Sequence, residues 1–464
     1  MTDTLNIRRT DGAPLDRLAA GLTGRLLLPG EPDYEARALP WNVAVPSSPA
    51  AVVEVADAAD VATVIRFAAE HGLEVDVRAT GHGAARVSER TLLVHTGRLD
   101  EVTVHQDGWA RVGAGVVWSQ VIEAAAPYGL APLCGSSPGV GVVGLITGGG
   151  LGPMARTFGH ASDHVRSFEV VTGDGVVRRA SAEENPALFW GLRGGKGTLG
   201  IVTAVELDLP SLPEFLGGCV YFGGADVAPV ARAWRAWADT LPEEATTSLA
   251  ILRLPDAPFV PAPLAGRCTV AVRFAWVGSS TDGAAVFAPM AQVAEPVFGG
   301  VAVMPYTQVG MIHADPVEPM PVLETVELLD DLSEAALDTL LELAGPEADC
   351  PQMIVEVRRL GGALSREPEH PSAVCHRSAG YSLLTIGIGV PPLLELTAAH
   401  ADRLADRMRD WTNGGALPNF GGNTTAAAVA RNFDAETLSR LSSLATAYDP
   451  AGVLAAGRAI RVAG

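Results

Sequence analysis

The feature that most constrains this chain is a glycine-rich segment over residues 135–152, with the sequence GSSPGVGVVGLITGGGLG. Eight of its eighteen residues are glycine and one is proline. Glycine destabilises the interior of helices and strands, so no regular element is expected to run through the segment. Glycine also lets a backbone approach a ligand closely. We therefore predict a binding loop built mainly from backbone.

Two familiar motifs compete for these glycines. Residues 139–144, GVGVVG, match the GxGxxG pattern of nicotinamide dinucleotide sites, but that pattern acts between a strand and the N-terminus of a helix. Prolines precede it here and LITGGGLG follows, so this context is missing. Residues 135–139, GSSPG, match the GxSxG motif of serine hydrolases, with Ser137 as nucleophile. Pro138 lacks the N–H that would complete the oxyanion hole, which weakens this alternative.

Two further patterns fit metal or phosphate sites poorly. HASDH (160–164) spaces two histidines as a zinc helix does, but it lacks the glutamate of HExxH. GLRGGKGT (191–198) resembles a phosphate loop, yet its lysine is followed by glycine rather than Ser or Thr. We predict no metal site and interpret the second pattern as a turn between strands.

Upstream of the glycine segment, the pattern predicts a βαβ unit over 51–78. AVVEV (51–55) and LEVDVR (73–78) have the composition of strands, and the helix between them has Asp57 as N-cap and Gly72 after its C-terminus. The unit leads into the loop RATGHGAA (78–85). His82 in this loop either caps a backbone group or, flanked by two glycines, acts as a nucleophile toward a bound cofactor.

The remainder of the chain separates at Pro210 and Pro213. Before them we expect strands at 92–95, 109–115 and 198–209 and a hairpin over 167–180 that turns at Asp174-Gly175. After them the pattern alternates helices (about 226–240, 333–344 and 394–411) with strands (268–277, 352–360 and 381–390). The last fifty or so residues contain one expected helix near 435–447 and are too few to fold alone.

Composition narrows the classes of partner. Thirty-three basic against 53 acidic residues give a net charge of −20, which repels nucleic acid and anionic lipid. Five scattered cysteines indicate a reducing compartment, and no stretch of 18 apolar residues occurs. We expect a cytoplasmic protein that binds neither nucleic acid nor membrane.

Four segments together resemble the berberine-bridge-enzyme-like flavoproteins of the vanillyl-alcohol-oxidase superfamily. They are RATGHGAA, GSSPGVGVVGLITGGGLGPMARTFGHASD, ENPALFWGLRGGKGTLGIVTAVELDL and, in the tail, LPNFGG followed by LATAYDP. The resemblance implies an α+β fold with a PCMH-type FAD-binding domain and an antiparallel-sheet substrate domain with covering helices. The implied boundaries are an N-terminal extension (1–36), the FAD-binding domain (37–210), the substrate domain (211–410) and a segment completing the FAD-binding domain (411–464).

The resemblance also implies the cofactor and its contacts. His82 matches the family histidine bonded to the 8α-methyl of FAD, and Ser137 stands where members with a second, cysteinyl link have cysteine. One covalent bond, through His82 only, is therefore expected. The implied cofactor-binding residues are His82, Arg78, Ala79, Thr80, Gly81, Gly83, Gly135, Ser136, Ser137, Val140, Gly141, Gly144, Gly148, Gly149, Gly150, Gly152, Ile201, Val202 and Asn419.

The catalytic base is where the chain departs from the family pattern. Many members carry Tyr-x-Asn in the tail, and here the triplet is Leu417-Pro418-Asn419. Tyr381 and Glu356 remain as candidate catalytic groups, with Arg358 and His313 as further polar residues. An exposed strand face would explain all of them equally well.

We thus predict an FAD-dependent oxidoreductase that oxidises a small organic substrate and passes the electrons to molecular oxygen. Val140 matches the family position that lines the approach of oxygen to the flavin. A tailoring step in secondary metabolism is the role the resemblance suggests. Three alternatives remain open: a flavoprotein with redox-neutral or weakened chemistry, a serine hydrolase, and a binding protein that retains a flavin fold.

Overall fold

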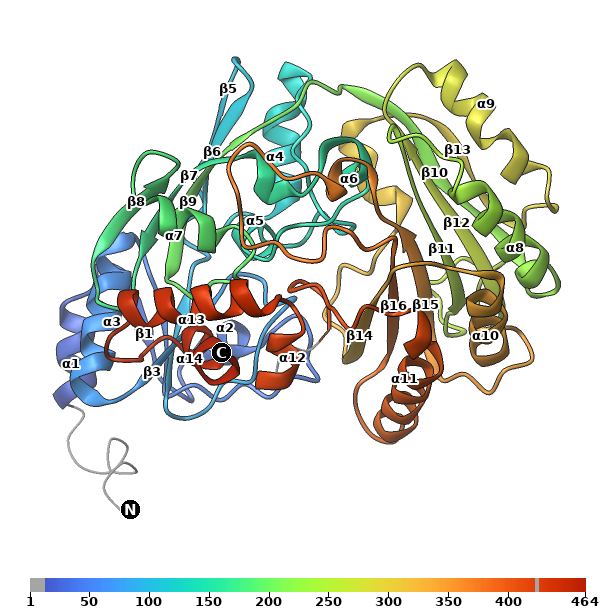
Figure 1. Ribbon diagram of the computed structural model, residues 1–464. Coiled ribbons are helices and arrows are strands. Elements are labelled where there is room, and N and C mark those ends of the chain that lie inside the picture. The colour runs from blue at the N-terminus through green and yellow to red at the C-terminus, as the bar shows by residue number, and fades with distance from the viewer. Residues whose placement is uncertain (1–12, 422–424) are drawn as a thin grey trace.

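The protein consists of two halves, each built around β-sheet (Figure 1). The computed structural model describes residues 13–421 and 425–464. Residues 1–12 of the predicted N-terminal extension lie outside the described residues. The remainder of that extension contains α1 (Ala13–Ala20), β1 (Arg25–Leu27) and the start of α2 (Tyr34–Ala38).

The first half contains a four-stranded sheet in the order β1-β2-β4-β3. Its other strands are β2 (Ala51–Glu54), β3 (Glu74–Arg78) and β4 (Thr91–His95). The predicted helix, α3 (Ala58–His71), begins at Asp57, whose side chain accepts a hydrogen bond from the Asp60 N–H, and ends at Gly72 with φ 64°. β4 pairs in parallel with both β2 and β3, so it separates the two strands of the predicted βαβ unit.

A five-stranded antiparallel sheet completes the first half, in the order β5-β6-β9-β7-β8. The strands are β5 (Val102–His105), β6 (Trp109–Gly113), β7 (Val165–Val171), β8 (Val177–Ser181) and β9 (Ile201–Asp208). β7 and β8 form the predicted hairpin, in which Gly175 has a positive φ of 73°. Helices α4 (Trp118–Ala125) and α7 (Pro186–Leu192) contribute buried side chains to the same core.

The glycine segment differs from the expectation of an irregular loop. It contains a short helix, α5 (Val142–Ile146), and is followed by a second one, α6 (Ala155–Phe158). α5 includes Gly144 but buries Val142, Leu145 and Ile146, and this burial offsets the low helix propensity of one glycine. The glycines on either side of α5 remain outside regular structure.

The second half is a seven-stranded sheet in the order β13-β10-β12-β11-β15-β16-β14, with every neighbouring pair antiparallel. The strands are β10 (Glu214–Gly223), β11 (Ala245–Arg253), β12 (Cys268–Trp276), β13 (Phe298–Pro305), β14 (Val322–Leu329), β15 (Gln352–Arg359) and β16 (Tyr381–Ile388). Four helices cover it: α8 (Val227–Ala238), α9 (Ser280–Ala291), α10 (Glu334–Ala344) and α11 (Leu394–Met408). The predicted α+β fold class is confirmed.

The two faces of this large sheet have different chemistry. One face is apolar and packs against the covering helices, with Trp234 of α8 and Leu340 of α10 fully buried. The other face carries charged side chains toward the glycine segment of the first half. Its polar residues include Ser248, Arg273, Glu356 and, further along the sheet, Glu324.

The tail returns to the first half, where α13 (Ala435–Tyr448) and α14 (Ala455–Ala463) lie below the five-stranded sheet in Figure 1. A short helix, α12 (Ala426–Ala430), precedes them. The Val75 N–H of β3 donates to the Val453 carbonyl at 2.8 Å, and Leu441 and Ile460 are buried in the same core as the β9 strand. The contacts of the tail therefore lie mainly with the N-terminal half of the chain.

Candidate functional site

The turn after β3 presents His82 in a defined orientation. The His82 ring stacks on the Trp41 indole, with centroids 4.6 Å apart and 16° between planes. The Thr80 hydroxyl oxygen lies 2.9 Å from Nδ1 of the same ring. Gly81 has a φ of 81°, and a Cβ there would lie 2.8 Å from Pro40 Cα, so only glycine lets this turn sit against the preceding segment. Trp41 is a site residue that the motif analysis missed.

The electrostatic environment keeps His82 neutral. Burial lowers the pKa of His82 to about 4, and the nearby Asp315 carboxylate opposes this effect only in part. At neutral pH the imidazole is therefore uncharged and retains a nitrogen lone pair, which is the form that can act as a nucleophile.

Arg78, the first residue of the same motif, has a structural environment. Its guanidinium is buried and donates to the Ala38 carbonyl and, at 3.0 Å, to the Ser47 hydroxyl. These bonds connect the end of β3 to the segment that leads to Trp41. A direct contact between the Arg78 side chain and the cofactor stays a prediction.

The glycine segment contacts the His82 turn and the tail. A Cβ on Gly141 would lie 3.3 Å from the Ala79 Cβ, and a Cβ on Gly148 would lie 2.1 Å from Asn419 Oδ1. The Asn419 amide donates to the Leu145 carbonyl at 2.7 Å. Predicted cofactor residues from three distant parts of the sequence are thereby brought to one place.

The glycines at the end of this segment are required for different reasons. Gly149 and Gly150 have φ values of 99° and 81°, which side chains rarely permit. Gly152 has no room for a side chain, because a Cβ there would lie 1.9 Å from the Cys134 carbonyl oxygen. The shape of the segment is therefore set by its glycines.

Lys196 is a second residue that the motif analysis missed. It follows α7 in a turn with a φ of 54°, and its amine donates to the Gly144 carbonyl at 3.1 Å and to Asn419 Oδ1. Burial lowers the pKa of Lys196 to about 8, while Glu324 raises it. The only sequence signal was the lysine within GLRGGKGT, which we interpreted as a turn.

Glycines near this lysine leave room beside the backbone. A Cβ added to Gly144 or Gly197 would meet no atom within 4 Å, and one added to Gly83 would meet only the Lys196 side chain. Backbone without side chains is thus open to a ligand at three segments. We call the turn 78–83, the segment 135–152 and the turn 194–197 the glycine cradle. It fits a phosphate-linked, planar group such as FAD.

The remaining predicted cofactor residues lie on or behind this cradle. Gly135 is buried, whereas Ser136, Ser137 and Val140 are half-buried. Ile201 and Val202 are buried at the start of β9, where they pair with Val171 and Val170. The hydrolase alternative gains no support, since no histidine in residues 13–421 and 425–464 hydrogen-bonds to Ser137.

Opposite the cradle, the seven-stranded sheet holds Glu356 in a network of ions. Arg273 Nη1 donates to Glu356 Oε1 at 2.6 Å, and Arg358 Nη2 donates to Oε2 at 2.9 Å. The Ser248 hydroxyl also donates to Oε1 at 2.6 Å, and His313 Nε2 lies 3.6 Å away. The two guanidinium groups hold the pKa of Glu356 well below its usual range, against the effect of burial. A carboxylate this strongly stabilised in its charged form is a poor proton acceptor.

Tyr381, the other predicted catalytic group, lies on the opposite face of the sheet. It packs with Trp234 under the covering helices, and its hydroxyl donates to Asp239 Oδ1 at 2.5 Å. Burial and this carboxylate raise its pKa. Because side chains alternate along a strand, Tyr381 and Glu356 cannot share one pocket, and the position of Tyr381 argues against the predicted catalytic role.

A carboxylate that the sequence did not single out occupies the cradle-facing side. Glu324 of β14 shares its face with Glu356, since they pair with Ile386 and Leu384, two positions apart on β16. Its Oε1 accepts the Gly421 N–H at 2.8 Å, beside Asn419 in the tail. Burial raises the pKa of Glu324, although Lys196 and Arg358 act in the opposite direction. Leu417, at the position of the family tyrosine, is buried in an apolar cluster with Leu151.

The described parts of the chain are residues 13–421 and 425–464. No helix within them combines the length and the apolar composition needed to cross a bilayer. Those same residues contain no group of three or more His, Cys, Asp or Glu side chains placed to hold a metal ion.

Comparisons with known proteins agree with this geometry. Residues 49–181 match the family described as FAD binding domain. The chain is 27% identical over 451 residues to (R)-6-hydroxynicotine oxidase of Paenarthrobacter nicotinovorans, covering 92% of this chain and 94% of that protein.

Solved structures share the fold over nearly the whole chain. BBE-like 1 of Physcomitrella patens superposes with a TM-score of 0.81 at 18% identity, covering 95% of this chain and 97% of that one. Glucooligosaccharide oxidase of Acremonium strictum, described as carrying 6-S-cysteinyl, 8α-N1-histidyl FAD, gives 0.79 at 18%, covering 95% and 97%.

The glycine cradle, the charged sheet opposite it and these matches define an FAD-dependent oxidoreductase with a PCMH-type FAD-binding domain. The chain is thus similar in sequence to FAD-linked oxidoreductases and shares the fold of a berberine-bridge-enzyme-like protein, and to that extent the resemblance inferred from its motifs is confirmed.

Proposed function

We propose that the protein is an oxidase that carries FAD bonded to His82 and oxidises a small organic substrate held between the glycine cradle and the seven-stranded sheet. The observation that carries this proposal is the neutral, stacked His82 ring at the edge of the cradle. Among the relatives, glucooligosaccharide oxidase is described with a histidyl-linked FAD. Ser137 stands in place of a second, cysteinyl attachment, so one bond is proposed.

The cradle residues would hold and orient the cofactor. FAD supplies a two-electron acceptor when it is bound, and the residues of the chain position the reacting groups around it. The Lys196 ammonium places a positive charge beside Gly144 and Asn419, where it would stabilise negative charge on the cofactor. The predicted cofactor residues are retained in this proposal, with Trp41 and Lys196 added.

Glu324 is the proton acceptor in this proposal, in place of Tyr381 or Glu356. A carboxylate whose pKa burial raises is closer to the working pH and is therefore a stronger base than one held by two arginines. Its hydrogen bond from Gly421 fixes the carboxylate next to the tail segment that contributes Asn419. The missing family tyrosine thus does not require redox-neutral chemistry.

Molecular oxygen is the proposed electron acceptor, because several relatives are named oxidases. Val140 is half-buried on the cradle, where a larger side chain would fill a space about the size of dioxygen. Val140→Leu should slow reoxidation of photoreduced protein in aerated buffer. An equal reoxidation rate in the variant would remove Val140 from the oxygen path.

The biological role we propose is a tailoring step on a natural product, since fungal relatives include FAD-dependent monooxygenases and FAD-linked oxidoreductases of this type. The direct test of the function is spectroscopic. Acid-precipitated protein should retain a yellow pellet, and candidate substrates should bleach the flavin absorbance under anaerobic conditions. A colourless pellet from the native protein would overturn the covalent bond, and a colourless native protein would overturn the flavoprotein itself.

A further inference from the structure

A pocket lies between the glycine segment and the seven-stranded sheet. Leu151, Gly152 and Ala155 form its cradle side, and Ile312 and Leu364 add apolar surface. Ser248, Arg273 and Arg358 form the sheet side. The pocket adjoins the predicted cofactor residues of the glycine segment.

The charged groups that line this pocket are all basic. Arg273, Arg358 and Arg359 line it together with His313, and its lining residues, all within the described part of the chain, include no Asp or Glu. This is unusual for a chain with 53 acidic and 33 basic residues. Glu356, which pairs with two of the arginines, lies behind the lining.

The ion pairs around the pocket give its arginines few direct partners. Arg273 and Arg358 share the single carboxylate of Glu356. Arg359 has its own partner, since its Nη2 lies 3.7 Å from Asp239 Oδ1. Burial and Arg273 lower the pKa of His313, so this residue adds no charge at neutral pH. The Asp315 carboxylate acts on Arg273 and the Glu324 carboxylate acts on Arg358, but neither makes a direct ion pair with them in the described residues, so the two guanidinium groups have one direct ion-pair partner between them.

Donors in this wall also lack partners. Arg273 Nε, Arg358 Nε and His313 Nδ1 are buried and make no hydrogen bond in the described structure. The Arg273 and Glu356 side chains are only 5% and 2% exposed, so water cannot easily hydrate them. A buried donor without a partner costs free energy, which a ligand with acceptor oxygens would recover.

We infer that this pocket binds the carboxylate of the substrate, and that the substrate class is therefore an organic monoanion with an apolar body. The inference rests on the proposed function, because it assigns the substrate of the same site. Arg273 and Arg358 share one direct ion-pair partner and have buried Nε donors without a hydrogen bond, and two guanidinium groups supply the paired donors that carboxylates accept. The apolar body lies against Leu151, Ile312 and Leu364.

The test is a calorimetric titration of the holoprotein with three aromatic probes of similar size: benzoate, benzamide and phenyl phosphate. Benzoate should bind at least about tenfold more tightly than neutral benzamide, because only benzoate offers a charged acceptor to the two guanidinium groups. Equal affinity for the two, or no heat with benzoate, would overturn the inference. Tighter binding of phenyl phosphate would overturn the assignment to a carboxylate.

Two substitutions act in opposite directions and keep the test decisive. Arg358→Gln removes one of the two guanidinium groups and should weaken benzoate binding by about tenfold or more. Glu356→Gln adds net positive charge and should preserve or tighten benzoate binding, so it decides the outcome if the first variant fails to fold. Weaker binding in Glu356→Gln would contradict the charge argument.

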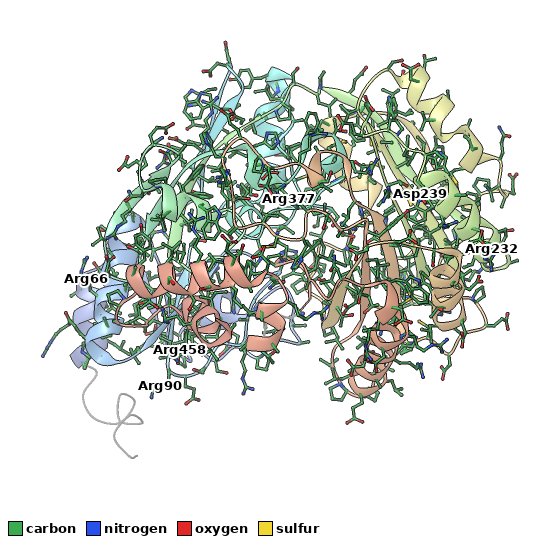
Figure 2. The ribbon with its side chains drawn as sticks, viewed as in Figure 1. Arg66, Arg90, Arg232, Asp239, Arg377 and Arg458 are labelled. Carbon is green, nitrogen blue, oxygen red and sulfur yellow. The ribbon has the colours of Figure 1, made fainter. Side chains whose placement is uncertain are left out.

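The matched control is Arg232→Gln on α8. Figure 2 shows Arg232 at the outer edge of the helices covering the sheet, and its guanidinium pairs with Asp338 at 2.6 Å in an exposed position. Its loss should leave benzoate affinity unchanged. Calorimetry measures binding without turnover. If benzoate binds but no substrate reduces the flavin, only the proposed function is contradicted. If uncharged substrates reduce the flavin and benzoate does not bind, only this inference is contradicted.

Discussion

The glycine cradle and the arginine-lined wall face each other across the same pocket, yet they are built by opposite means. The cradle presents backbone from short, local segments, and its shape depends on positions where a Cβ would collide, such as Gly148 and Gly152. The wall presents long side chains from regular strands, and residues 83 and 108 positions apart meet at the Glu356 carboxylate. The backbone surface of the cradle suits a cofactor that is common to many enzymes, whereas the side chains of the wall suit a particular substrate.

This difference explains which parts of the site tolerate change. Backbone geometry cannot be altered without replacing a glycine, so the cradle admits few substitutions. Side chains on a rigid sheet can be exchanged one at a time with the scaffold intact. The following predictions test whether the two regions are as separate as this comparison implies.

The largest effect is expected at the cradle. His82→Ala removes the nitrogen that would bond FAD, so acid precipitation of the variant should release all its flavin into the supernatant, whereas native protein retains it. His71→Ala, which changes an exposed histidine on α3, is the control and should retain the flavin. Flavin retained in the His82→Ala pellet would mean that another residue forms the bond.

The next effect should appear on the sheet side and leave the cradle intact. Glu324→Gln removes the proposed proton acceptor, so the rate of flavin reduction under substrate should fall by about 10²–10⁴, with the covalent flavin content unchanged. Glu327→Gln changes a residue on the opposite face of the same strand and should have a much smaller effect. A normal reduction rate in Glu324→Gln would exclude this glutamate as the base.

Acid should destabilise the folded protein through its buried histidines. Burial lowers the pKa values of His95 and His160 to about 4 from 6.5. The unfolded chain therefore takes up protons below pH 6.5 that the folded chain accepts only near pH 4, so stability falls as pH is lowered through this window. Glu356, with its lowered pKa, stays charged across the same range and its pairs persist.

Each of these histidines should contribute on the order of 1 kcal/mol of lost stability at pH 5.5. Urea unfolding at pH 7.5 and 5.5 measures the loss. His160→Gln should reduce the pH dependence, and His71→Gln, at an exposed position, should not. Stability that is equal at both pH values would show that the buried histidines are protonated or hydrated in the folded state.

The smallest effect is expected at Tyr381. Tyr381→Phe removes the hydroxyl that donates to Asp239, at a cost of about 1 kcal/mol in unfolding free energy, because water can hydrate the half-exposed carboxylate instead. The rate of flavin reduction should be unchanged. Tyr128→Phe, at an exposed tyrosine, provides the reference for a hydroxyl without a buried partner. A reduction rate lowered tenfold in Tyr381→Phe would restore its predicted catalytic role.

The sequence could predict several features of the first half, including the glycine segment of the cradle, because their signals are local. The glycine segment, the capped helix α3 and the hairpin at Asp174-Gly175 each depend on a few adjacent residues, and the structure contains all three. The α5 helix inside the glycine segment was missed because burial of its apolar residues, a tertiary effect, outweighs glycine propensity.

The wall could not be predicted in the same way. Periodicity indicated β12, β15 and β16, but the register that places Ser248 between Arg273 and Arg358 arises from strand pairing over long separations. The same register puts Tyr381 behind the sheet and Glu324 in front of it. Lys196 was overlooked for a further reason: its contact with Asn419 joins residues 223 positions apart.

The position of Asn419 has a consequence for the making of the protein in the cell. The ribosome synthesises the His82 turn and the glycine segment early. Asn419, whose amide donates a hydrogen bond to the Leu145 carbonyl, lies 274 residues after Leu145. The entire seven-stranded sheet must be synthesised before this contact can form. Synthesis proceeds at about 5–20 residues per second, so the nascent cradle stays incomplete for tens of seconds, and loading of FAD follows translation of the tail.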